Sequence, residues 1–313
     1  MSDKPSPRFA FFGTPHLATV FLDDLAKSGL TPALIVTTPD RKVGRGLAQT
    51  SPPVKVWADS HGVPTLQTES FDEKAMQKLG SHEYDVFVVI YYGKLIPKTV
   101  LDIPKRGVLN IHFSLLPRWR GTSPVRAAIA HDDREVGTTV MLLDEKLDHG
   151  PIIAQKKFTP ADWPPRASAL EEVLTHESAH LLAEILPAWL SGDIEAHPQN
   201  HDLATECPAL EKTDGLLDLS ADPYTNLLKI RAYDTTIGTY AMFERPSTGS
   251  TGSPQAGSGR AAKQIRVRIL DAHLMGGPST PLRAGTLVID TVKPEGKREM
   301  SYEDFVRSGA RPL

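Results

Sequence analysis

The sequence predicts a mixed α/β fold, namely a Rossmann-like, mostly parallel sheet with helices on both faces, followed by a smaller OB-like β-barrel domain. Short β-branched or aromatic runs alternate with longer amphipathic stretches through the first half of the chain, which is typical of βαβ units. After residue 205 the pattern changes to short alternating runs, as in a small β domain. The length of 313 residues suits two domains, each with its own core.

The first half is expected to supply the parallel sheet and its helices. Apolar runs predict strands at residues 8–13, 33–38, 85–91, 108–112 and 138–143. Helices are expected at residues 17–27, 53–61, 71–80 and 124–130. A longer helix is expected at 168–190, because five apolar residues fall on one face there: Leu170, Leu174, Leu181, Ile185 and Trp189.

The domain boundary is expected between residues 205 and 206, which gives a catalytic domain at 1–205 and a β-barrel domain at 206–313. The second domain should hold one helix at 224–232 and strands at 238–243, 265–271 and 285–292. Residues 246–259 are almost all Pro, Ser, Thr and Gly, so we expect a flexible loop there.

Charge and cysteine content narrow the class of protein. The net charge of −3 gives no sign of a basic nucleic-acid binder. From Cys207 onward, however, 14 basic residues stand against 12 acidic ones, so the second domain is mildly cationic. A single cysteine excludes an intramolecular disulfide framework. No signal peptide or membrane span is indicated, so we expect a cytoplasmic protein with no membrane contact, and a monomer.

Asn110 and His112 are candidates for catalysis. They lie two residues apart on the expected strand at 108–112, so both side chains point to one face near its carboxyl end, where α/β sheets bind ligands. An amide can donate to a developing oxyanion and an imidazole titrates near neutrality, so the pair suits a tetrahedral transition state. The alternative is structural, with Asn110 in a turn and His112 in the core.

Asp148 strengthens the catalytic interpretation. It lies in Leu147-Asp148-His149-Gly150-Pro151, a loop after the strand at 138–143, where a carboxylate can favour the charged form of a nearby imidazole. With Asn110-x-His112 and Ser114-Leu115-Leu116-Pro117, the order and spacing resemble the 10-formyltetrahydrofolate-dependent formyltransferases. The resemblance implies Asn110, His112 and Asp148 as the catalytic triad.

Further motifs resemble the branch of that family that formylates initiator methionyl-tRNA in translation initiation. They are Phe12-Gly13-Thr14-Pro15, Pro39-Asp40-Arg41 with Gly44-Arg45-Gly46, Ser51-Pro52-Pro53-Val54-Lys55, Arg118-Trp119-Arg120-Gly121 with Pro124, and Met300-Ser301 with Asp304-Phe305. The resemblance implies 10-formyltetrahydrofolate as formyl donor and no metal. It implies folate contacts from Ser114, Leu115, Leu116, Pro117, Tyr92, Gly93, Leu143 and Leu147.

The segment at 38–55 carries three cations, Arg41, Lys42 and Arg45, that could contact a phosphate backbone or a base edge. A solvated surface loop is the alternative. By resemblance, these cations contact the acceptor end of the initiator tRNA, and the second domain also contacts the tRNA.

Other functions stay open. A formyltransferase acting on an amino-sugar nucleotide would carry a similar second domain, and a tRNA-binding protein without catalysis is less consistent with a filled triad. His176-Glu177-Ser178-Ala179-His180 matches the zinc-protease pattern H-E-x-x-H, but both histidines are expected to face water. Gly13-Thr14-Pro15 is not G-x-G-x-x-G, which disfavours an NAD-dependent enzyme.

Two departures from the family stand out. Residues 234–238 read Asp-Thr-Thr-Ile-Gly where the family commonly has Pro-Trp-Pro-Gly, which puts the contact between the domains in question. Tyr91 stands where a small residue is common, so the pterin pocket is expected to have a different shape.

Overall fold

The computed structural model describes residues 7–43, 48–245, 263–276 and 285–313. The chain forms two compact units. The first consists of Met1–Val125, Glu135–Pro160 and Leu170–Pro208, and the second of Arg126–Arg134, Ala161–Ala169 and Ala209–Leu313. Two short segments that precede residue 170 thus belong to the second unit. The flexible loop expected at 246–259 lies outside the described residues.

The first unit is built on a seven-stranded sheet with the strand order β10-β9-β7-β6-β1-β2-β5. Neighbouring strands from β7 to β5 pair in parallel, whereas β9 pairs antiparallel with both β7 and β10. The prediction of a mostly parallel sheet is therefore confirmed. The strand bounds are β1 Phe9–Phe12, β2 Leu34–Thr37, β5 Thr65–Gln67, β6 Val86–Val89, β7 Val108–His112, β9 Val136–Leu142 and β10 Ile152–Phe158.

Helices cover both faces of this sheet, as the sequence predicts. Successive residues of a strand point to opposite faces. The Phe11 ring lies 6.1 Å from that of Phe21 on one helix, whereas Phe12 packs in a cluster with Leu79 of another. The helices of this part of the chain are α1 His16–Lys27, α2 Pro53–Ser60, α3 Glu73–Gly80, α4 Lys98–Leu101, α5 Pro124–Ala130 and α6 Ala167–Ser191.

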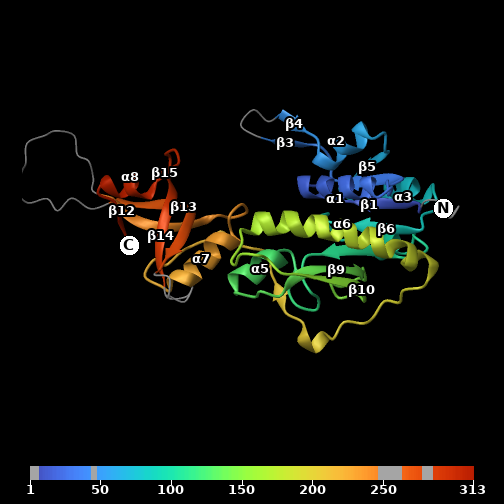
Figure 1. Ribbon diagram of the computed structural model, residues 1–313. Helices are drawn as coiled ribbons and strands as arrows, with labels where there is room; N and C mark the ends of the chain where they lie inside the picture. The colour runs from blue at the N-terminus through green and yellow to red at the C-terminus, as the bar shows by residue number, and fades with distance from the viewer. Residues whose placement is uncertain (1–6, 44–47, 246–262, 277–284) are drawn as a thin grey trace, which may run out of the picture. The chain divides into compact units, whose positions relative to one another are not determined.

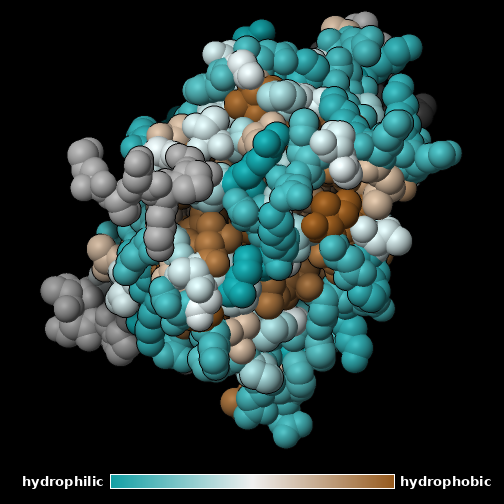
Figure 2. Space-filling view, turned by 90° about the vertical axis from the view of Figure 1, so that its right-hand side faces the viewer, coloured by the Kyte–Doolittle hydropathy of each residue, from teal (hydrophilic) through white to brown (hydrophobic). Residues whose placement is uncertain are grey.

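The core explains why the central strands read as continuous apolar runs. Every residue of β1, β2 and β6 is buried, since helices shield both faces of these strands. The five apolar residues expected on one face of the long helix α6 are all buried as well. Figure 2 shows the complementary exterior, where polar residues cover most of the face and hydrophobic residues show in smaller patches.

Several strands were not expected from the sequence, because they are short or polar. β3 (Arg41–Val43) and β4 (Ala48–Thr50) form a two-stranded antiparallel sheet, and the three residues of β4 are exposed. β8 (Arg120–Gly121) and β11 (Glu206–Cys207) pair in parallel. β10 is an edge strand whose residues 155–157 are exposed, so it lacks the apolar run that marks β6 or β7.

The second unit contains a five-stranded antiparallel sheet with the order β15-β14-β13-β12-β16. Phe243 and Phe305 anchor its own core, with rings 5.1 Å apart. This confirms the expected small β domain. Its elements are α7 Pro223–Ala232, β12 Thr239–Arg245, β13 Lys263–Met275, β14 Thr286–Pro294, β15 Met300–Ser301, α8 Tyr302–Arg307 and β16 Arg311–Pro312.

Residues 234–238 make polar contacts within the second unit. Asp234 accepts hydrogen bonds from the backbone and hydroxyl of Ser168, and Arg126 donates to the Thr235 hydroxyl at 3.0 Å. Asp234 and Thr235 therefore bind Ser168 and Arg126, which belong to the two short segments of the second unit, to its long segment Ala209–Leu313.

Helices α1 and α6 lie side by side (Figure 1), and a buried carboxylate of α1 joins them. Asp24 of α1 is 6% exposed and accepts hydrogen bonds from Lys27 and from Nδ1 of His176 on α6. Burial raises the pKa of Asp24, but the hydrogen bonds from Lys27 and His176 outweigh burial and lower the pKa overall. His176 thus has a structural partner in the first unit.

No helix among the described residues is long and apolar enough to cross a membrane.

Replacing Asp24 should cost stability in a pH-dependent way. Asp24→Asn removes charge-assisted hydrogen bonds, so we expect unfolding to cost about 1.5–3 kcal/mol less near neutral pH. Because the folded-state pKa lies below the ordinary value of 3.8, the carboxylate stabilises the fold above that value and loses its effect as the pH falls through the folded-state pKa. Urea unfolding of both proteins between pH 7 and pH 3 should therefore show converging stabilities.

The control for this prediction is Asp59→Asn. It removes an equal charge from an exposed pair with Lys55 and should change stability by less than about 1 kcal/mol. A stability difference between wild type and Asp24→Asn that stays constant down to pH 3 would contradict the assigned contact.

Candidate active site

Asn110 and His112 lie on the wall of a cavity of about 840 Å³ in the first unit. Both belong to β7, whose carboxyl end lies between parallel β6 and antiparallel β9. The alternation of side chains along the strand puts both residues on one face, as the sequence predicts. Asn110 is half-buried, whereas His112 is 6% exposed. An ionisable side chain and an amide are therefore presented together at the edge of the sheet where α/β proteins bind ligands.

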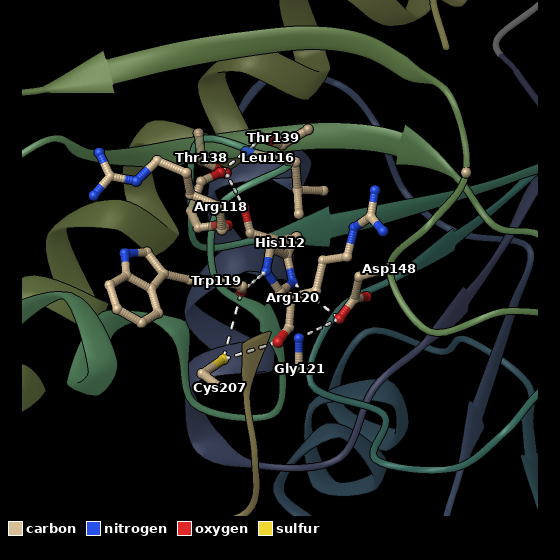
Figure 3. A network of polar contacts seen from close by, with 12 residues as sticks. His112, Leu116, Arg118, Trp119, Arg120, Gly121, Thr138, Thr139, Asp148 and Cys207 are labelled. Atoms are coloured by element: carbon tan, nitrogen blue, oxygen red, sulfur yellow. Dashed lines mark hydrogen bonds and ion pairs between the residues drawn. The ribbon is translucent and has the colours of Figure 1, made fainter. Parts of the chain in front are cut away.

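Both ring nitrogens of His112 face acceptors of the protein. Nε2 lies 2.9 Å from the carbonyl oxygen of Trp119, and Nδ1 lies 3.7 Å from Oδ2 of Asp148 (Figure 3). Because a carbonyl can only accept, Nε2 carries the proton in that hydrogen bond. Nδ1, on the other side of the ring, faces the Asp148 carboxylate. His112 and Asp148 therefore lie close together, and their catalytic roles stay a prediction.

Asp148 is held in the loop that follows β9. It is 7% exposed, and its Oδ2 accepts a hydrogen bond of 2.8 Å from the backbone N–H of Gly121. Its φ of 46° is in the left-handed region, which few residues other than glycine adopt without support from their surroundings. The carboxylate therefore lies between a backbone donor and the imidazole of His112.

Gly150 is required by this loop. A Cβ atom at residue 150 would overlap the backbone carbonyl of Leu142, so a larger residue could not keep the same path. The glycine lets the chain turn back against β9 immediately after Asp148. The place of glycine in the segment Leu147-Asp148-His149-Gly150-Pro151 therefore has a steric reason.

Four of the eight predicted folate-contact residues line the cavity: Tyr92, Gly93, Leu143 and Leu147. Tyr92 packs against Phe12 with the rings 5.5 Å apart, and burial, followed by the charge of Glu69, raises its pKa to about 12. The Tyr92 phenol therefore stays protonated at neutral pH. Tyr91, with a φ of 52°, also lines the cavity.

The other four, Ser114, Leu115, Leu116 and Pro117, are not among the residues of the cavity wall. They form the turn after β7, in which the Ser114 hydroxyl donates to the Arg118 carbonyl at 2.6 Å. The buried Thr139 hydroxyl donates to the Ser114 carbonyl at 2.6 Å and lies 3.2 Å from the Leu116 amide. In this structure the turn is held to Thr139 of β9 and to the Arg118 carbonyl, and its contact with folate stays a prediction.

Of the three cations expected to bind tRNA, two are not on the cavity wall and the third lies outside the described residues. Arg41 and Lys42 are exposed residues of β3, and Arg45 lies outside the described residues. Arg41 approaches Glu69 at 3.9 Å, and the same carboxylate pairs at 2.7 Å with Lys94, which does line the cavity. Asp40, next to Arg41, accepts a hydrogen bond from Gln67 at 2.6 Å. Polar contacts therefore connect the start of this hairpin to residues beside the cavity.

The H-E-x-x-H pattern does not form a metal site in the described part of the chain. His176 pairs with Asp24, and His180 is exposed. Among the described residues, no group of three or more His, Cys, Asp or Glu side chains is placed to hold a metal ion.

Sequence reasoning missed the groups that hold His112 and Asp148 in place. Two are backbone atoms, the Trp119 carbonyl and the Gly121 N–H, which no sequence pattern can single out. A third is the buried side chain of Gln199, which lies far along the chain from both motifs.

Cys207 lies beside the same segment. Its thiol approaches the carbonyls of Trp119 and Arg120 at 3.4 and 3.3 Å (Figure 3). Burial raises the pKa of Cys207 to about 11, so the thiol is protonated at neutral pH.

Comparison with known proteins identifies the family. Residues 7–185 match the formyl transferase family. The methionyl-tRNA formyltransferase of Chloroflexus aggregans is 37% identical over 94% of this chain and 94% of its own length. That of Myxococcus xanthus is 36% identical over 96% of this chain and 95% of its own.

Solved structures share the fold at lower identity. The N-formyltransferase of Helicobacter canadensis, solved with folinic acid and dTDP-3-aminofucose, superposes with a TM-score of 0.59 at 13% identity. That match covers 90% of this chain and 98% of the other. Since the relatives that match at 36–37% identity cover both units, the chain belongs to the methionyl-tRNA formyltransferase family of formyl transferases.

Proposed function

We propose that the chain transfers a formyl group from 10-formyltetrahydrofolate to the α-amino group of initiator methionyl-tRNA. The observation that carries the proposal is the cavity at the end of β7, whose wall brings together Asn110, His112 and Asp148. Family membership over nearly the whole chain supports the tRNA acceptor, because the second unit is covered as well.

The cavity fits a folate. Its volume of about 840 Å³ is in the range of pockets for cofactor-sized ligands. Its wall joins apolar residues such as Val89, Ile96 and Leu143 to a few polar ones, which suits a pterin ring with a polar edge. The folate supplies the formyl group when bound, and the chain's own residues would orient it and stabilise the charge that develops on the formyl oxygen.

The roles of the three residues follow from their surroundings. Asn110 would donate its side-chain N–H to the formyl oxygen, since the amide is on the cavity wall. His112, whose nitrogens face the Trp119 carbonyl and Asp148, would place a positive charge beside that oxygen. Asp148 would hold His112 in the charged form. It would also help to move the proton of the attacking amine to the folate nitrogen, which leaves as the bond between that nitrogen and the formyl carbon breaks.

The tRNA would be contacted by Arg41, Lys42 and Arg45 and by the second unit. Exposed cations of β3 can neutralise phosphates without entering the cavity. We propose the domain roles expected from the sequence, with catalysis in residues 1–205 and further tRNA contacts, beyond those of the three cations, in residues 206–313. In the described structure the uninterrupted part of the second unit begins three residues after that boundary, at Ala209.

Removing any one of the three side chains should lower the rate of formyl transfer. Asn110→Ala deletes an oxyanion donor, so kcat should fall about 10² to 10³-fold. His112→Ala and Asp148→Asn should have effects of similar size, because each removes one part of the charged pair. The measurement is formylation of methionyl-tRNA with labelled 10-formyltetrahydrofolate, with circular dichroism to verify folding.

His180→Ala serves as the control for these variants, since this exposed histidine lies outside the site and would matter only in a metal-binding H-E-x-x-H. It should keep wild-type activity. Folded Asn110, His112 and Asp148 variants that all formylate at the wild-type rate would rule out the proposed mechanism.

The acceptor can be tested by offering methionyl-tRNA and an amino-sugar nucleotide side by side. We expect formylated methionyl-tRNA and no formylated sugar. The opposite product would assign the chain to sugar formylation, and binding of tRNA without either product would indicate a protein that has lost catalysis.

Arg41→Ala and Lys42→Ala should weaken tRNA recognition and leave chemistry intact. Each should raise KM for methionyl-tRNA about three- to tenfold. Each should also lower the slope of log KM against log salt concentration by about one, the value expected for the loss of one phosphate contact. KM for the folate should not change. Lys74→Ala, an exposed cation of α3, is the matched control, and an equal effect there would show that general charge, not this hairpin, matters.

A further inference from the structure

Gln199 is a buried amide beside the candidate active site. It lies between α6 and β11, outside every motif that the sequence offers, and it is 5% exposed. A buried glutamine loses its hydrogen bonds with water, so its polar atoms need partners in the protein. The identity of those partners is what connects Gln199 to Asp148.

The carboxamide of Gln199 uses its full hydrogen-bonding capacity. Its Nε2 donates to the backbone carbonyls of Asp148 at 2.9 Å and Gly150 at 2.8 Å. Its Oε1 accepts from Nε and Nη2 of Arg120 at 3.1 and 2.6 Å. Two donors and two acceptor positions are thus satisfied, which fixes the orientation of the amide.

These four bonds join the two segments that hold His112. Arg120 lies between Trp119, whose carbonyl accepts from His112, and Gly121, whose N–H donates to the Asp148 carboxylate. On its other side, the amide holds the carbonyls of Asp148 and Gly150. Gln199 therefore fixes the backbone of the residue whose carboxylate faces the imidazole.

The segment that carries Gln199 is itself anchored. His197 exchanges two backbone hydrogen bonds of 2.8 Å with Ile152 of β10. On the other side, the Nδ1 atom of His201 lies 2.8 Å from Nη2 of Arg120, and its ring stacks on that of His149 with centroids 4.1 Å apart. The residues on both sides of Gln199 are thus held by contacts of their own.

We propose that Gln199 is a positioning residue for formyl transfer, which holds the strained Asp148 peptide so that its carboxylate stays against His112. This inference rests on the roles proposed for Asp148 and His112. A φ of 46° at Asp148 persists only where neighbouring contacts over-determine the backbone, and two of those contacts come from one side chain. Loss of the amide would let the carboxylate move while leaving Asn110 and the cavity in place.

Gln199→Ala should affect turnover more than binding. A misplacement of the order of 1 Å at a reacting site costs about 10²-fold in rate, so kcat should fall about ten- to a hundredfold. KM for the folate and for methionyl-tRNA should stay within about threefold of wild type, since Gln199 is not on the cavity wall. A fall in kcat below threefold, or a change confined to KM, would overturn the proposal.

A double-mutant cycle with Asp148→Asn separates positioning from general structural support. If Gln199 acts through the Asp148 carboxylate, adding Gln199→Ala to Asp148→Asn should lower kcat by less than about threefold more. Multiplicative effects of the two substitutions would show that Gln199 acts independently of the carboxylate, and the proposal would be wrong.

Gln199→Glu tests the donors separately, because it keeps the size of the side chain and an oxygen toward Arg120 but loses the N–H groups for Asp148 and Gly150. It should fold as wild type does and still lose kcat at least tenfold. Asn200→Ala, which alters the adjacent exposed residue, should retain full activity. Full activity of Gln199→Glu would overturn the proposal.

The two proposals fail in different ways. If Asp148→Asn lowers activity and folded Gln199 variants do not, only the positioning role is wrong. If the wild-type protein forms no formyl-methionyl-tRNA, or Asp148→Asn is fully active, the proposed function itself is wrong.

Discussion

The hydrogen bond from the Gly121 amide to the Asp148 carboxylate is the contact on which the candidate active site depends. It joins the segment after β7 to the loop after β9, and His112 lies between them with one nitrogen toward each. Without it, the carboxylate would be a buried charge facing only an imidazole at 3.7 Å, and burial of a poorly paired charge is costly. The site is thus a junction of two segments held at a strand end.

The parts of this structure that could be predicted are those with a repeating pattern or a distinctive side chain. β1, β2, β6 and β7 are apolar because both faces are covered, and Asn110-x-His112 stands out on such a strand. β3 and β4 are three residues each and mostly polar in sequence, so no apolar periodicity marks them. The Trp119 carbonyl and Gln199 could not be found in advance, because a backbone atom is common to all residues and one glutamine has no pattern.

The second unit and the long helix show how local sequence can mislead. His176 and His180 match a metal-binding motif, yet His176 pairs with Asp24 of α1. Asp24 lies about 150 residues earlier in the sequence, so only the packing of α1 against α6 in the fold brings the two side chains together. In the same way, Asp234 and Thr235 differ from the family pattern but bind Ser168 and Arg126 through polar contacts. In both cases the partners are far apart in the sequence, so the spacing of residues within a motif could not predict the contact.

The chemistry of Cys207 has a practical consequence for spectroscopy. The chain's sole cysteine is buried, and burial raises its pKa to about 11, so little of the maleimide-reactive thiolate is present at neutral pH. A cysteine engineered into an exposed position would therefore be the thiol that takes up a fluorophore or spin label. Distances between chosen points could then be followed during turnover without first replacing the native residue beside Trp119 and Arg120.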